Sequence, residues 1–502
     1  MDVSSRSSCL PGTRVAIINE ILDWVIKPES DGTKNILWLH GVAGSGKSTL
    51  ATTIAKRFYD LRRQGAYLFF ERAKSSPGIV IRTLAHKLAN FDASIGAAIS
   101  DCLRDDKDIT ERSYEDQFER LLYQPLTKAS TKLTGPIVII LDAFDECGDA
   151  SSRSKLLDIL VEGIPRLPTM FRFLITSRRE SDIDSKFSTC FSIKPLLLSM
   201  GENEATEDIR AYITSELNKI RTSRSLSSEW PEREDLDKLV QYSGGLFIWV
   251  STVSKLLYTE TNPMAQLKEL LLSGKVQGLD SVYVTALQSS CTWQGEKSWN
   301  EFRSVLTVVL FSCEYLNEHA IDHLLGWTSG NSCGQILSRL GCLLDLSPGQ
   351  PIRPLHASFR DYLTDASRSK DEQWSLTSID PEHFLAECCL RVMSNQLHFN
   401  MFGIKTSYHR DGDYFRANAK AEISPELYYA CNNWWKHLKS MQTLGQSDPL
   451  AKALSDFGSE QFLFWVEVVS VMKISGSYEA CQVVAKLMKV SNLSLLICVN
   501  IL

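Results

Sequence analysis

Three apolar runs in the first part of the chain predict buried β-strands. They cover residues 35–39, 136–141 and 171–176, and their apolar residues are continuous rather than alternating. Continuous apolar strands are typical of a parallel sheet that is covered on both faces. Helical patterns at residues 79–90 and 115–127 separate the runs. We therefore expect an α/β fold, a parallel sheet with helices on both faces.

The chain then becomes helical. Amphipathic segments are expected at residues 207–220, 236–258 and 263–272, and Asn262 before Pro263 is typical of a helix start. These segments predict a helical domain behind the sheet.

A third region combines helices with two short strands. Helices are expected at residues 302–313, 318–325 and 335–340, strands at 343–346 and 352–355, and a further helix from His356. Helices followed by a two-stranded β-wing predict a winged-helix domain, and the rest of the chain is rich in helical patterns.

Composition excludes some classes of function and location. Across 502 residues the formal charge is −6, so no global field attracts nucleic acid or acidic lipid. The 13 cysteines include no C-x-x-C pair and no secretory signal precedes them, which favours reduced thiols and a cytoplasmic location. The longest apolar tail, residues 493–502, is about half a membrane span, so no membrane anchor is expected.

A phosphate-binding loop follows the first apolar run. Residues 41–48 read Gly-Val-Ala-Gly-Ser-Gly-Lys-Ser, which fits G-x-x-x-x-G-K-[ST] between a strand and a helix. Glycines let the backbone N–H groups point at a phosphate, and Lys47 adds a positive charge. Ser48 is a candidate Mg²⁺ ligand. The candidate nucleotide-binding residues of this loop are Gly41, Gly44, Ser45, Gly46, Lys47, Ser48 and Thr49.

Acidic residues follow the second apolar run. Asp142 ends this Walker B strand and is the second candidate Mg²⁺ ligand. Asp145 or Glu146 could polarise the attacking water, and the sequence leaves open which of them does so. Arg178, after the third run, is a candidate sensor of the γ-phosphate.

These patterns divide the chain into five regions. We expect a lead-in helix at residues 1–34, a P-loop NTPase core at 35–195, a helical domain at 196–298, a winged-helix domain at 299–368 and a C-terminal helical region at 369–502.

The combination of these motifs resembles the NACHT branch of the STAND signalling ATPases. Three further segments are similar to fungal NACHT NTPases and to the nephrocystin-like NTPase domain: Cys9-Leu10-Pro11-Gly12-Thr13-Arg14, Gly244-Gly245-Leu246-Phe247-Ile248-Trp249, and His356-Ala357-Ser358-Phe359-Arg360-Asp361-Tyr362-Leu363. The resemblance runs from about residue 9 to about residue 470. The family's Gly-x-Pro turn, whose proline contacts adenine, is replaced here by Gly245-Leu246-Phe247.

The resemblance implies roles for residues that the local pattern does not assign. It implies that Arg14 contributes to the nucleotide site and that His356 can reach the β-phosphate of ADP. The alternative for His356 is a capping or core histidine.

Three weaker patterns are set aside. Ser243-Gly244-Gly245 is similar to part of the ABC-transporter signature. In those proteins the signature lies between the two Walker motifs, whereas here the tripeptide follows both. Asn218-Lys219-Ile220-Arg221 lacks the aspartate of the guanine-reading pattern, so ATP is favoured over GTP. His319 and His323 have a zinc-compatible spacing, yet no third ligand is apparent in the sequence.

The leading hypothesis is an ATP/ADP-operated switch in signal transduction with slow, Mg²⁺-dependent ATP hydrolysis. Protein partners or self-association are expected in the open state. Binding to nucleic acid or to a membrane is not expected. A nucleotide-binding scaffold without significant hydrolysis is the first alternative, and a ring-forming mechanical ATPase is the second.

Overall fold

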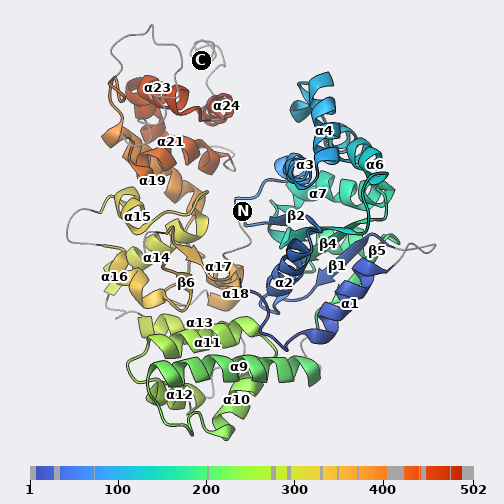
Figure 1. Ribbon diagram of the computed structural model, residues 1–502. Coiled ribbons are helices and arrows are strands. Elements are labelled where there is room, and N and C mark those ends of the chain that lie inside the picture. Colours follow the sequence, from blue (N-terminus) through green and yellow to red (C-terminus); the bar gives the residue numbers. More distant parts are fainter. Residues whose placement is uncertain are drawn as a thin grey trace. The chain divides into compact units, whose positions relative to one another are not determined.

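The chain folds into two compact units, residues Met1–Val282 and Tyr283–Leu502. The computed structural model describes residues 7–27, 34–72, 74–199, 203–272, 279–290, 295–327, 332–347, 350–369, 372–403, 423–439, 441, 448–474 and 476–488. The apolar tail at residues 493–502 therefore lies outside the described residues. Figure 1 shows the elements along the chain.

A five-stranded parallel sheet forms the centre of the first unit (Figure 1). Its strands are β1 (Ile36–His40), β2 (Gln64–Phe69), β3 (Ile137–Asp142), β4 (Phe171–Ser177) and β5 (Ile193–Leu197). Their order is β2-β3-β4-β1-β5, so β4 lies between the P-loop strand and the acidic strand. Every neighbouring pair is parallel, and all carboxyl ends therefore meet at one edge. The three strands predicted from apolar runs are confirmed. Strand β2 also carries an apolar run, residues 66–70, that the predictions did not include, and Lys194 interrupts β5.

Both faces of the sheet are covered, as the continuous apolar runs predict. Leu37 and Leu39 of β1 join one apolar cluster with α1 (Val15–Ile26) and α2 (Lys47–Asp60). The alternate residues Ile36 and Trp38 join a second cluster on the opposite face. This alternation follows from the two-residue period of a strand.

The second cluster is built from the helices between the strands. They are α3 (Val80–Phe91), α4 (Ala93–Asp105), α5 (Tyr114–Phe118), α6 (Gln124–Ser130), α7 (Ala150–Asp158) and α8 (Ser181–Phe187). A π-helical turn, Glu119–Tyr123, joins α5 to α6, and a second one, Ile159–Gly163, extends α7. The helices predicted at residues 79–90 and 115–127 are confirmed.

The helical part of the first unit begins with α9. Its helices are α9 (Asn203–Ser223), α10 (Arg233–Ser243), α11 (Phe247–Thr259) and α12 (Pro263–Leu272). The single segment predicted at residues 236–258 is wrong, because Gly244 and Gly245 adopt positive φ angles of 54° and 82° and separate α10 from α11. Asn262 Oδ1 accepts the Ala265 N–H at 3.1 Å, which confirms the predicted start of α12. The boundary between the units falls within α13 (Leu279–Ser290).

The described residues of the second unit are helical apart from one pair of very short strands. Its elements are α14 (Gly295–Phe311), α15 (Glu318–Leu325), α16 (Gly334–Leu337), β6 (Leu344–Asp345), β7 (Arg353–Pro354), α17 (Ala357–Thr364), α18 (Ala366–Ser369), α19 (Pro381–Gln396), α21 (Pro425–Leu438), α22 (Pro449–Asp456), α23 (Phe462–Met472) and α24 (Ser477–Met488). Strands β6 and β7 pair antiparallel. The helices and strands predicted from residue 302 onward are confirmed as elements, and the winged-helix assignment stays a prediction.

None of the helices in the described parts of the chain combines the length and apolar character needed to cross a lipid bilayer.

Candidate nucleotide-binding site

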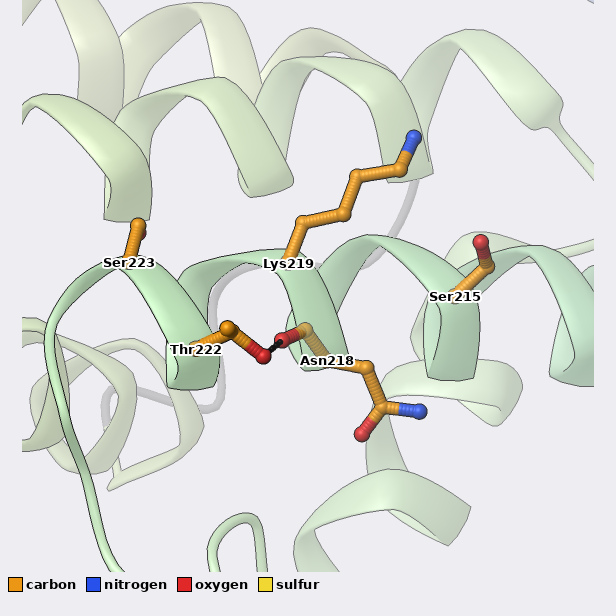
Figure 2. Close-up of a pocket in the computed structure, with 5 residues that line it drawn as sticks. All are labelled: Ser215, Asn218, Lys219, Thr222 and Ser223. Carbon is orange, nitrogen blue, oxygen red and sulfur yellow. Dashed lines mark hydrogen bonds between the residues drawn. The ribbon is translucent and has the colours of Figure 1, made fainter.

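One open depression of about 530 Å³ lies along α9 and does not contain the predicted site. It is lined by Ser215, Asn218, Lys219, Thr222 and Ser223 (Figure 2). The Thr222 hydroxyl is already bonded to the Asn218 carbonyl at 2.9 Å, within the helix. Asn218 and Lys219 thus belong to a helix surface, and the chemistry has to be sought at the carboxyl edge of the sheet.

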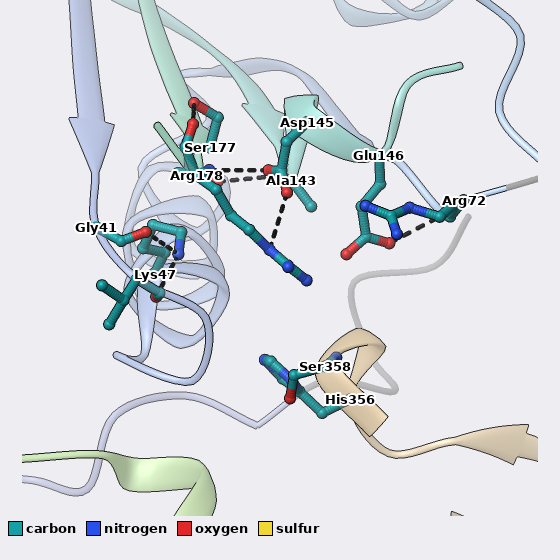
Figure 3. Close-up of polar contacts among 12 residues, drawn as sticks. Gly41, Lys47, Arg72, Ala143, Asp145, Glu146, Ser177, Arg178, His356 and Ser358 are labelled. Atoms are coloured by element: carbon teal, nitrogen blue, oxygen red, sulfur yellow. Dashed lines mark hydrogen bonds and ion pairs between the residues drawn. The ribbon is translucent and has the colours of Figure 1, made fainter. Parts of the chain in front are cut away.

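The phosphate loop joins β1 to α2 and folds tightly around the Lys47 side chain. Gly44 and Gly46 adopt positive φ angles of 79° and 98°, which side chains disfavour. Lys47 Nζ donates hydrogen bonds of 2.8 Å to the carbonyls of Gly41 and Val42 (Figure 3). Burial lowers the pKa of Lys47 to about 8, and the nearby carboxylate of Asp145 opposes this effect. The ammonium group is therefore directed into the loop, where a phosphate would replace the carbonyls.

The two predicted metal ligands lie next to each other. Ser48 Oγ donates to Asp142 Oδ1 at 3.1 Å. Asp142 is fully buried, and the hydroxyls of Thr176 and Tyr67 also donate to its carboxylate. Two hard oxygen donors at this spacing suit Mg²⁺, which takes one or two carboxylates and completes its shell with water and phosphate. Ser48 and Asp142 therefore fit a magnesium site.

Asp145 and Arg178 form an ion pair that joins the turns after β3 and β4. Asp145 Oδ1 accepts the Arg178 backbone N–H at 3.0 Å, and Oδ2 lies 3.2 Å from Arg178 Nε (Figure 3). Only 5% of the surface of Asp145 is exposed. Both oxygens of this carboxylate are thus used to orient Arg178.

Glu146 has a different environment. Its Oε2 accepts the backbone N–H of Arg72 at 3.3 Å (Figure 3). Burial, followed by the negative charge of Asp145, raises the pKa of Glu146 to about 7. A carboxyl group with this pKa can take up or release a proton near neutral pH.

Arg153 supports the same turn and was not identified from the sequence. Its Nη1 donates to the carbonyls of Asp145 and Gly148 at 2.9 and 3.1 Å. Its other nitrogens bond both carboxylate oxygens of Asp182 at 3.0 and 3.1 Å. The buried guanidinium therefore fixes the backbone that carries Asp145 and Glu146.

Arg14 lies behind the phosphate loop. Its guanidinium donates to the Ser45 carbonyl at 3.0 Å and lies 4.8 Å from the centre of the Phe247 ring. The Arg14 backbone N–H donates to Asp208 of α9 at 3.0 Å. Arg14 thus connects the lead-in segment, the loop and the helical part, and its predicted contact with nucleotide stays a prediction.

Helix α11 contacts the loop directly. The Ile248 N–H donates to the Gly44 carbonyl at 3.3 Å. A Cβ atom at Gly44 would lie 2.0 Å from Ile248 Cγ2, so only glycine leaves room for this contact. The segment Gly244 to Trp249, noticed in the sequence for its resemblance, therefore has a packing role at the loop.

His356 is the N-cap residue of α17 within the second unit. Its Nδ1 accepts the Ser358 backbone N–H at 3.1 Å, and the Ser358 hydroxyl also contacts Tyr283 Oη at 2.7 Å. A neutral His356 ring must therefore carry its proton on Nε2. The capping role is shown, and the role in contacting ADP stays a prediction.

The structure brings the predicted loop, Asp142, Asp145, Glu146 and Arg178 together at one edge of the sheet. Thr49 lies in the first turn of α2, where its carbonyl accepts the Thr53 hydroxyl at 2.8 Å. The residues that sequence reasoning missed are Tyr67, Arg72 and Arg153. Thr176 and Ile248 stand in segments already noted in the sequence, and only the structure shows their contacts at this edge.

Comparison with protein families identifies one match. Residues 15–178 match the family described as "Nephrocystin 3, N-terminal". The match covers the lead-in helix, the phosphate loop, the acidic strand and Arg178, and it supports a P-loop NTPase with a nephrocystin-like core. No curated protein matched the chain by sequence.

Solved structures with overall similarity are distant. Cdc6p from Pyrobaculum aerophilum is 11% identical with a TM-score of 0.32, over 71% of this chain and 95% of that one. Drosophila ORC bound to DNA is 13% identical with a TM-score of 0.28, over 66% and 81%. Drosophila ORC bound to GC-rich DNA and Cdc6 is 12% identical with a TM-score of 0.29, over 94% and 69%. TM-scores this low carry no argument about function.

We predict that Gly44→Ala destabilises the protein more than Gly12→Ala does. Both residues have positive φ, 79° and 88°, so each alanine costs about 1–2 kcal/mol in backbone strain. A Cβ at Gly44 would also overlap the side chain of Ile248, whereas nothing lies within 4 Å of a Cβ at Gly12. Overpacking against Ile248 should add about 1–3 kcal/mol. Chemical denaturation measures both costs, and adding Ile248→Ala should recover part of the Gly44→Ala loss. Equal costs for the two alanines would contradict the contact.

We also predict that Glu146 makes stability depend on pH. Its pKa of about 7 lies above the ordinary value of 4.5, so the folded state binds the proton more tightly than the unfolded state. The resulting stability is fully present below pH 4.5 and is lost as the pH rises through 7, at most about 3 kcal/mol. Unfolding of the wild type and of Glu146→Gln, measured without nucleotide between these pH values, should show a flatter profile for the variant. Identical profiles would contradict the shift.

Proposed function

We propose that this chain is an ATP/ADP-operated conformational switch of the NACHT type that hydrolyses ATP slowly in the presence of Mg²⁺. The observation that carries the proposal is the convergence at one sheet edge of a complete phosphate loop, a Ser48–Asp142 pair at 3.1 Å and the Asp145–Arg178 ion pair. A glycine turn that only joined a strand to a helix would not require buried acids and a buried lysine beside it.

Lys47 and the loop backbone would bind the phosphates. The two carbonyls that Lys47 contacts are weaker partners than a charged phosphate oxygen, so a bound nucleotide should draw Nζ away from them. The N-terminus of α2 adds its positive dipole end. Ser48 and Asp142 would hold Mg²⁺, which supplies positive charge that offsets the phosphate oxygens.

Glu146 is the better candidate for the base that activates water. Asp145 uses both carboxylate oxygens on Arg178, so it is better suited to positioning that guanidinium. Glu146, with a pKa of about 7, can accept the proton of a water that attacks the γ-phosphorus. Arg178 would place positive charge near the departing phosphate.

The switch would act through helix α11 and the second unit. Because Ile248 contacts Gly44, a change in loop shape on nucleotide exchange would be felt by α11. Moving a population from 1:99 to 99:1 takes about 5.5 kcal/mol of differential binding. We propose that residues 299–368 form a winged helix whose His356 contacts ADP in the closed form, and that the open form binds protein partners or another copy of the chain.

The direct test is nucleotide binding by Lys47→Ala. Loss of the buried cation should weaken ATP binding by about 2–5 kcal/mol, measured by calorimetry. Arg57→Ala, which removes an exposed cation farther along α2, is the control and should bind ATP normally. Near-unchanged ATP affinity in Lys47→Ala would refute the phosphate site.

Glu146→Gln should separate binding from hydrolysis. We expect ATP to remain bound while phosphate release falls by at least about tenfold. Asp145→Asn should instead disturb Arg178, because the amide nitrogen that replaces one carboxylate oxygen cannot accept a hydrogen bond from that residue. If neither variant releases phosphate more slowly than the wild type, the acids are structural and the nucleotide-binding scaffold gains support.

His356→Leu should weaken ADP more than ATP. A bond from Nε2–H to a charged phosphate oxygen is worth about 1.5–3 kcal/mol, or roughly 10- to 150-fold in affinity. The leucine also removes the α17 cap, so His356→Asn is the matched variant, because asparagine retains a capping acceptor. Both variants should release ADP faster in stopped-flow measurements. Faster release in His356→Leu alone would assign the effect to the cap.

A further inference from the structure

Three metal-ligating side chains meet in the second unit, and the proposed nucleotide chemistry uses none of them. His383 and Glu387 lie four residues apart on α19, and Asp448 is the N-cap residue of α22. One ligand atom from each residue lies within 4.8 Å of the others. The three residues therefore connect two helices, and His383 and Asp448 are 65 residues apart in the sequence.

The three side chains lie close enough to reach one small ion, but the two contacts of His383 use opposite nitrogens of its ring. His383 Nε2 lies 3.0 and 3.3 Å from the two oxygens of Asp448, and His383 Nδ1 lies 3.9 Å from Glu387 Oε1. Bonds of about 2.0–2.2 Å in tetrahedral geometry place ligand atoms roughly 3.2–3.6 Å apart. Because an ion binds one ring nitrogen only, the Glu387 side chain, which is 38% exposed, would have to turn from Nδ1 toward an ion held by Nε2 and Asp448, and Nε2 and the Asp448 oxygens would have to separate by a few tenths of an ångström.

Asp448 is held in place for this role. Its Oδ1 accepts the Leu450 backbone N–H at 2.9 Å, as an N-cap carboxylate does. The side chains of His383 and Asp448 are 30% and 23% exposed, so water can reach the cluster and fill a remaining coordination position.

We propose that His383, Glu387 and Asp448 bind a divalent transition-metal ion of the Zn²⁺ class. An imidazole with two carboxylates suits such ions, whereas Mg²⁺ and Ca²⁺ prefer oxygen ligands alone. The bound ion clamps the start of α22 to α19. Because it binds the folded chain, it raises the free energy of unfolding by an amount that grows with the logarithm of the ion concentration once this exceeds the dissociation constant.

The chain contains a matched comparison in His319 and His323 of α15. Their rings lie 4.3 Å apart, and two histidines are the stronger zinc pattern in the sequence. Among the described residues, however, the only group that brings three potential ligands together is His383, Glu387 and Asp448. The sequence pattern thus favours His319 and His323 as metal ligands, whereas the structure favours the cluster of His383, Glu387 and Asp448.

The main alternative is a charged histidine paired with two carboxylates and no metal. Such ion pairs at partly exposed positions contribute little to stability, and they do not need a metal. Metal titration distinguishes the two cases.

The experiment is a titration of the full-length, chelator-treated chain with Zn²⁺ in a calorimeter, and with Co²⁺ in an absorption spectrometer. We expect one ion per chain at this cluster, with the visible Co²⁺ bands of nitrogen and oxygen ligation. His383→Ala and Asp448→Asn should each weaken binding by at least about tenfold. Asp448→Asn keeps a capping side chain, so its loss of binding does not reflect a lost helix start.

The controls use the other histidines and the cysteines. His319→Ala combined with His323→Ala should leave the affinity unchanged, and Zn²⁺ should raise the melting temperature of this variant as it does that of the wild type. The proposal is overturned if the wild type binds no ion, or if binding survives His383→Ala. It is also overturned if binding is lost in the double variant, or if the near-ultraviolet band of cobalt–thiolate ligation accounts for all bound metal.

Discussion

Charged groups buried at the end of an apolar sheet are the constraint on which the first unit depends. Lys47, Asp142 and Asp145 are 9%, 0% and 5% exposed, at the carboxyl edge of strands whose side chains are almost entirely apolar. A buried charge without a partner is strongly unfavourable, so each of these groups needs bonds that the surrounding chain must supply. Lys47 donates hydrogen bonds to two loop carbonyls, and Asp142 accepts hydrogen bonds from three hydroxyls. Asp145 accepts the backbone N–H of Arg178 and forms an ion pair with its guanidinium. The same demand explains the buried Arg153, whose five nitrogen-to-oxygen bonds are spread over the turn carbonyls and Asp182. The charged groups of this edge are therefore held in place by bonds from the protein itself.

The sequence predicted those parts of the fold that local patterns determine. Strands β1, β3 and β4 are central and buried on both faces, so each needs a continuous apolar run that is visible in the sequence. Strands β2 and β5 are at the edges. Strand β5 alternates between covered and uncovered residues, whereas β2 has a continuous apolar run at residues 66–70 that was not assigned to a strand. The break between α10 and α11 was missed for a different reason. The apolar period continues across Gly244 and Gly245, and only the positive φ of both glycines shows that the helix axis changes there.

The candidate site was predictable where its residues follow strand ends and less so where they contact backbone. Ser48, Asp142 and Arg178 stand at fixed offsets from apolar runs, and parallel strands bring such positions together. Arg153 and Arg72 act through main-chain groups, which every residue has, so no residue type in the sequence marks their partners. The choice between Asp145 and Glu146 likewise needed the structure, because it depends on which carboxylate Arg178 occupies. The same limit applies to the second unit, where the meeting of His383 with Asp448 depends on how α22 packs on α19.

The glycine pair between α10 and α11 has a consequence for how motion could pass through the first unit. Gly244 carries no side chain, and nothing lies within 4 Å of the position where one would begin. The first turn of α11 is fixed to the phosphate loop by Ile248 on Gly44, only four residues beyond Gly244. The glycine turn and the loop contact therefore lie at the same end of α11. A displacement of the loop would be applied to α11 at its N-terminal end, next to a turn where no side chain stands between the two helices.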